Sequence, residues 1–104
     1  MSHASTDKAC ESTRLELLRL AESGEDYEKA LLLTAECARS PDRWLRINAL
    51  HCFGYIARVY GRLELEVALP LLYEARHEAT DAEVAAAAQD ALSDLEVFLP
   101  GFKA

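Results

Sequence analysis

The sequence predicts an all-α fold, a short right-handed α-solenoid of about five antiparallel helices, and three observations lead to this prediction. A hydrophobic outline that begins near Pro41 returns 39 residues later, so that Leu45 corresponds to Val84. Glycine, proline and capping residues divide the chain into segments of helical length. The connections between these segments are about two to four residues long, which makes successive helices antiparallel neighbours. A period of this length is typical of stacked helical hairpins.

The elements follow in order along one domain, residues 1–104. An N-terminal helix is expected over about 11–22, where leucines line adjoining faces, and residues 5–7 are compatible with a backward extension. A first repeat is expected over about 26–60. Its first helix covers about 26–39, and its second helix starts near Pro41 and ends at Tyr60. A second repeat is expected over about 63–99. Its first helix covers about 63–78, and its second helix starts near Thr80 and ends at about Leu99.

Short polar and glycine-containing segments set the helix boundaries. Gly24 and Gly61 each follow a helix, as residues that close a C-terminus do. Ser40 is expected to cap the third helix, with Pro41 in its first turn and Asp42 complementing the dipole. Thr80-Asp81-Ala82-Glu83 matches a capping box that opens the fifth helix.

Composition excludes several classes of function. The net charge of −7 argues against nucleic-acid binding, which depends on Lys and Arg. No apolar stretch is long enough for a membrane span, and the N-terminus does not resemble a signal peptide, so we expect a cytoplasmic protein. Cys10, Cys37 and Cys52 lack metal-site spacing, and no phosphate loop or nucleophile elbow occurs. We therefore expect no metal, no cofactor and no catalytic residues.

Two short motifs stand out in the two hairpins. Ser40-Pro41-Asp42 is followed by Leu45-Arg46, and Ala68-Leu69-Pro70-Leu71-Leu72 places a proline within a helix. These motifs resemble the turn aspartate, the Val-Arg pair and the bent first helix of the HEAT-repeat family, which belongs with the armadillo-like helical repeats. The second repeat has Ala85 in place of the arginine, which fits a terminal unit. The resemblance implies that the second helix of each hairpin lines a concave surface.

One face of the third helix is unusual. On a helical wheel of about 100° per residue, an arc of roughly 80° between two apolar flanks holds bulky polar side chains. The corresponding positions of the fifth helix include carboxylates. Aromatic residues and arginine are the types most enriched in interface hot spots. The predicted partner-binding residues are Trp44, Asn48, His51, Tyr55, Arg58 and Arg62, with Glu83, Asp90 and Asp94 beside them.

Two simpler interpretations of this face stand beside the binding hypothesis. Trp44 could tuck into the core beneath the first helix, and Tyr55 and Arg58 could pair with Asp90 or Asp94 across the groove. Burial of both flanks around a stripe of bulky polar groups favours a binding surface instead.

These observations predict a protein that binds another protein and is not an enzyme. A short, acidic, single-domain chain resembles bacterial immunity proteins, which neutralise a cognate toxin, and acidic groups would steer a basic toxin domain. The alternative is a HEAT-like regulatory adaptor or scaffold subunit, and a lyase-type enzyme is a third possibility. We expect a monomer in the free state.

Overall fold

The computed structural model describes residues 2–103, with side chains from residue 11 onward, and within this range all secondary structure is helical. None of the described helices is both long and apolar enough to cross a membrane. The five helices are α1 (Ser2–Ser23), α2 (Tyr27–Ala38), α3 (Arg43–Tyr60), α4 (Leu65–Arg76) and α5 (Ala82–Phe98). The prediction of a small all-α fold of five helices is therefore confirmed.

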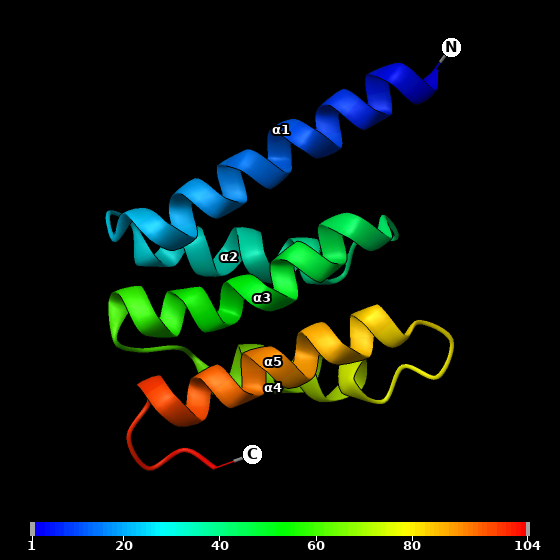
Figure 1. Cartoon of the computed structure of the whole chain (residues 1–104). Coiled ribbons are helices and arrows are strands. Elements are labelled where there is room, and N and C mark those ends of the chain that lie inside the picture. Colours follow the sequence, from blue (N-terminus) through cyan, green and yellow to red (C-terminus); the bar gives the residue numbers. More distant parts are fainter. Residues whose placement is uncertain (1, 104) are drawn as a thin grey trace.

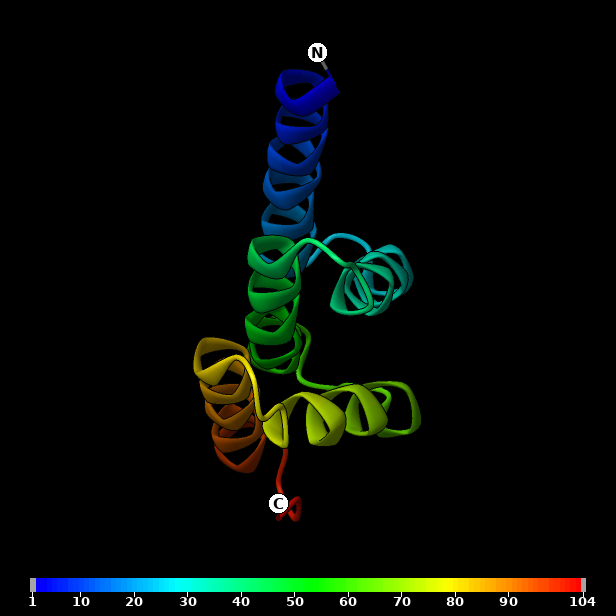
Figure 2. The same ribbon diagram turned by 90° about the vertical axis from the view of Figure 1, so that its right-hand side faces the viewer.

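The helices form two layers (Figures 1 and 2). One layer contains α1, α3 and α5, which run in the same direction, and the other contains α2 and α4, which run in the opposite direction. α1 begins nine residues earlier than the predicted range, at Ser2 rather than Glu11, and its N-terminal half projects away from the stack (Figure 1).

Aspartates rather than hydroxyl side chains cap three of the helices. The carboxylates of Asp26, Asp42 and Asp81 accept hydrogen bonds from free backbone N–H groups in the first turns of α2, α3 and α5. The predicted cap at Ser40 is therefore wrong, because its hydroxyl instead accepts from the backbone N–H of Asp42, at 3.0 Å. Thr80 likewise does not cap α5 and donates its hydroxyl proton to Glu78.

The core is centred on α3, which packs against α1, α2 and α5. Most apolar side chains of α3 are buried, Leu50 among them, whereas Ile47 and Val59 on its flanks are half-buried. Phe53 and Ile56 of α3 are among the largest side chains that are fully buried. α3 ends at Gly61, whose φ of 70° is the left-handed conformation that glycine tolerates best.

Tyrosine hydroxyls tie the turns to the helices. The hydroxyl of Tyr60 donates to the backbone carbonyl of Leu20, at 2.8 Å, and accepts from the N–H of Asp26. The hydroxyl of Tyr27 accepts from the N–H of Glu64, at 2.8 Å, and the two tyrosine rings meet edge to face. These bonds fix both turns at one end of the stack, because each hydroxyl satisfies backbone groups that the helices leave unpaired.

The two thiols within the core carry no sign of reactivity. Cys37 and Cys52 are both buried. Burial raises the pKa of Cys52 to about 12, so this thiol stays protonated at neutral pH. Cys10 lies outside the residues whose side chains are described.

The α3–α5 contact depends on a glycine. A Cβ placed on Gly54 would lie 2.6 Å from Oδ2 and 3.0 Å from Cβ of Asp94. Gly54→Ala should therefore destabilise the protein, because overpacking typically costs about 1–3 kcal/mol and outweighs the gain of roughly 1 kcal/mol in helix propensity. Urea unfolding followed by circular dichroism measures the change.

A double-mutant cycle tests whether Asp94 is the cause. In an Asp94→Ala background the clash with the carboxylate is gone, so Gly54→Ala should cost at least about 1 kcal/mol less than in the wild type. Strictly additive effects would show that α3 and α5 do not approach each other at this point.

Thr34 on α2 carries a buried hydroxyl. The residue is fully buried, and its Oγ1 has no hydrogen-bond partner among the described residues. Thr34→Val keeps the shape of the side chain and removes the unsatisfied hydroxyl, so it should raise the free energy of unfolding by about 1 kcal/mol. A lower melting temperature for this variant in calorimetry would contradict the burial of Thr34.

Candidate functional site

Five predicted binding residues of α3 form one continuous row on the layer that contains α1, α3 and α5. The row excludes the buried core positions of α3, and Trp44 in it is 58% exposed. The simpler interpretation in which Trp44 is part of the core is therefore wrong. We call this row the α3 stripe: Trp44, Asn48, His51, Tyr55 and Arg58.

The N-terminal part of the α3 stripe is held by neighbouring polar groups. The guanidinium of Arg43 lies 4.4 Å from the ring centroid of Trp44, a cation–π contact. The side-chain amide of Asn48 donates to the carbonyl oxygen of Trp44, at 2.8 Å. An exposed indole with a cation on one face retains its edges and its second face for a partner.

The C-terminal part of the α3 stripe is a stack of three side chains. The rings of His51 and Tyr55 lie nearly parallel, with centroids 6.5 Å apart and planes 15° apart. The guanidinium of Arg58 lies 5.3 Å from the Tyr55 centroid. Contacts within the stripe restrict these side chains before any partner binds, which lowers the entropy lost on association.

The α3 stripe does not pair with the acids of α5. Arg58 forms no salt bridge within the described residues, so the predicted alternative of pairing with Asp90 or Asp94 is not observed. Asp90 is exposed, while Asp94 packs against Gly54. The third predicted acid, Glu83, is 2.8 Å from the guanidinium of Arg43.

Arg43 was not among the predicted site residues, yet it joins α3 to α5. Its Nε and Nη2 donate to both carboxylate oxygens of Asp81, at 2.6 and 2.9 Å. Arg43 lowers the pKa of Asp81 to about 2, and the two carboxylates together raise the pKa of Arg43. Because Asp81 also caps α5, one carboxylate holds the start of α5 beside the start of α3.

Arg62 lies apart from the α3 stripe. Its guanidinium is 3.8 Å from the ring centroid of Tyr27, and 3.7 Å separates it from the carboxylate of Glu28. Both contacts are with α2, in the other layer. The helical wheel places Arg62 on the stripe only if α3 continues past Tyr60, whereas Gly61 ends the helix.

α1 contributes a flank that the sequence reasoning missed. Burial is the main cause that raises the pKa of Tyr55, and the charge of Glu22 on α1 adds to it, which places Glu22 near the stripe. Leu15 and Leu18 lie on the same face of α1 as Glu22. Leu15 is 56% exposed. The α3 stripe therefore lies between an apolar flank on α1 and carboxylates on α5.

No family model, no curated protein and no solved structure matches this chain. Among the described residues, no group of three or more His, Cys, Asp or Glu side chains is placed to hold a metal ion. Geometry and chemistry therefore carry the functional argument.

The Arg43–Asp81 pair should make stability depend on pH. The pKa of Asp81 lies below its ordinary value of 3.8, so the ionised carboxylate stabilises the fold above about pH 4, and this contribution is lost as the pH falls toward 2. Arg43→Gln should therefore destabilise the protein at pH 7 and much less at pH 2. Thermal melts across this range provide the measurement.

Arg76→Gln is the control for this pH series, because Arg76 forms no salt bridge within the described residues. Its effect on the melting temperature should stay constant between pH 7 and pH 2. A constant effect of Arg43→Gln over the same range would contradict the pairing with Asp81.

Proposed function

We propose that this protein is a non-enzymatic, cytoplasmic binding module that captures another protein on the α3 stripe, and that it serves as a small immunity-type protein that neutralises a basic toxin domain. The observation that carries the proposal is the row of aromatic and basic side chains on α3, with Trp44 and Arg58 exposed and Tyr55 half-buried, opposite the buried apolar face of the same helix. Tryptophan, tyrosine and arginine that reach the surface in one row have the chemistry of a hot spot.

The charges around the stripe support a basic partner. Asp90 and Glu22 are exposed on the two helices that flank α3, and the chain carries a net charge of −7. Such carboxylates raise the rate at which a basic protein associates, whereas the aromatic stripe supplies contact area that slows dissociation. The HEAT-repeat resemblance agrees with this proposal, since it assigns the second helices of the hairpins to a concave binding face.

The experiment has two stages. Wild-type protein immobilised on beads is used to isolate a stoichiometric partner from the native host, and the partner is then expressed alone and together with the wild type in a neutral host. Growth arrest by the partner, relieved by the wild type, supports an immunity function. A harmless partner would overturn the immunity function and favour the adaptor alternative.

Truncation of the stripe should weaken the isolated complex. Trp44→Ala and Tyr55→Ala should each cost about 2 kcal/mol or more of binding free energy, mostly as faster dissociation. Asp90→Asn combined with Asp94→Asn should instead slow association and reduce its dependence on salt. Surface plasmon resonance at two ionic strengths separates the two effects.

Tyr73→Ala is a matched control for Tyr55→Ala. Tyr73 on α4 is also half-buried and also lies under an arginine three residues later, with the Arg76 guanidinium 4.9 Å from its ring centroid. It belongs to the other layer, so its loss should leave binding unchanged. Wild-type affinity in folded Trp44→Ala and Tyr55→Ala variants would remove the α3 stripe from the interface.

A further inference from the structure

A second surface lies on the layer opposite the α3 stripe. α2 exposes Leu32, at 67%, beside a groove of about 340 Å³. Leu20 and Leu33 supply the apolar lining, and charged side chains form the rim. The groove residues are Glu16 and Leu20 of α1 together with Lys29, Leu32, Leu33 and Glu36 of α2.

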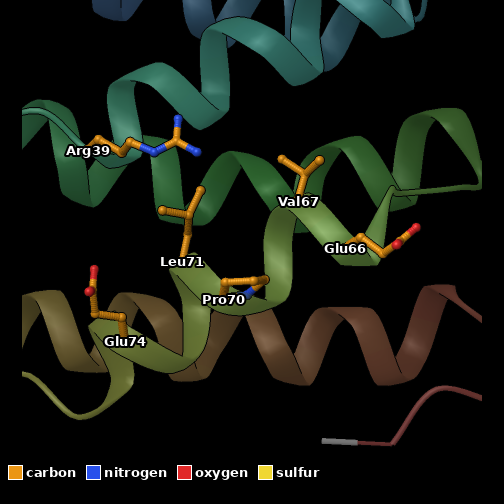
Figure 3. Close-up of a pocket in the computed structure, with 6 residues that line it drawn as sticks. All are labelled: Arg39, Glu66, Val67, Pro70, Leu71 and Glu74. Atoms are coloured by element: carbon orange, nitrogen blue, oxygen red, sulfur yellow. The ribbon is translucent and has the colours of Figure 1, made fainter.

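The second repeat has a corresponding groove, of about 550 Å³, beside α4. The corresponding face of α4 carries Val67, Leu71 and Glu74, and Arg39 of α2 forms the opposite wall of its groove (Figure 3). α4 therefore has a preceding helix in its own layer, whereas α2 has none. α1 lies in the other layer, and residues 2–23 are all one helix, so the described chain supplies no helix for this position.

The exposed face of α2 is complementary to itself. Leu32 and Leu33 are at its centre, Lys29 lies three residues before them, and Glu36 lies three residues after them. If a second α2 packs antiparallel across a two-fold axis at this centre, Lys29 meets Glu36 of the partner subunit, and the reciprocal pair forms on the other side. Neither side chain has a salt bridge within the described residues.

We propose that two copies of this chain associate through antiparallel α2 helices. Leu32 of each copy enters the groove beside Leu20 and Leu33 of the other copy, and the two Lys29–Glu36 pairs close the ends. Each copy carries the protruding Leu32 side chain and the groove that receives it on one face, as an isologous interface requires. The α3 stripe lies on the other layer, so a dimer leaves both copies of the stripe free for partners.

The size of the contact sets the strength of this association. α2 is 12 residues long, and a single pair of such helices buries less than the roughly 1,600 Å² of a standard interface. We expect a dissociation constant on the order of 10⁻⁵ to 10⁻⁴ M. The proposal thus differs from the sequence-based expectation of a free monomer, which stays a prediction, because it gives an equilibrium that depends on concentration.

Sedimentation velocity from about 5 to 500 μM tests the proposal. The wild type should shift from monomer to dimer over this range, and Leu32→Asp should remain monomeric throughout. Leu32 is largely exposed, so this substitution does not threaten the fold. Val97→Asp is the matched control, because Val97 is 71% exposed on α5 and should leave the equilibrium unchanged.

Charge reversal tests the pairing itself. Lys29→Glu and Glu36→Lys each place like charges opposite one another in the homodimer, so each should weaken association at least tenfold. An equimolar mixture of the two variants, and the double variant Lys29→Glu/Glu36→Lys, should both recover dimerisation. Both reversals suit the helix dipole of α2, so folding is not at risk.

The outcomes decide the proposal in either direction. Recovery in the mixture establishes that residue 29 of one copy faces residue 36 of the other. A wild type that stays monomeric at 500 μM overturns the dimer. A dimer that ignores Leu32→Asp, or single reversals whose mixture does not recover, overturns the α2 interface.

Discussion

The burial of α3 on three sides is the constraint on which the rest of the structure depends. α1, α2 and α5 cover its apolar faces, with Leu50, Phe53 and Ile56 fully buried. A helix enclosed in this way has one arc left for solvent, and the bulky polar groups of α3 lie on that arc. The position of the α3 stripe is therefore a consequence of core packing. Any change that rotates α3 would bury Trp44 and expose an apolar flank.

Contacts between the repeats fix the rotation of α3 relative to α5. Arg43 binds both carboxylate oxygens of Asp81 at one end of α3. Arg46 of α3 lies 3.6 Å from the carboxylate of Glu78, in the turn between α4 and α5. Farther along, Gly54 allows Asp94 to approach the backbone of α3. Polar pairs set the register, and small residues set the distance between the helices. A binding surface supported in this way loses little conformational entropy when a partner arrives.

Local patterns predicted the helices well, because hydrophobic period and glycine stops act within a few residues. The cap of α3 was less predictable, since Ser40 and Asp42 are both residue types that can cap a helix and only the local geometry decides between them. Arg62 was misplaced because the helical wheel assumes that α3 continues beyond Gly61. The role of Arg43 required knowledge of a partner 38 residues away, at Asp81. The exposure of Leu15 was not predictable, because helical period alone does not tell which flank of α1 faces its neighbours.

The two ends of the stack differ in a way that limits assembly. The outer flank of α5 carries Gln89, Ser93 and Glu96, all exposed, and its exposed apolar side chains, Val97 and Phe98, are confined to its last turn. The N-terminal end exposes Leu32 beside an apolar groove. If both ends were apolar, copies could join head to tail into an open filament; one self-complementary end closes at a dimer. The polar cap on α5 would thus do more than keep the last repeat hydrated, because it would confine association to α2 and leave each α3 stripe accessible.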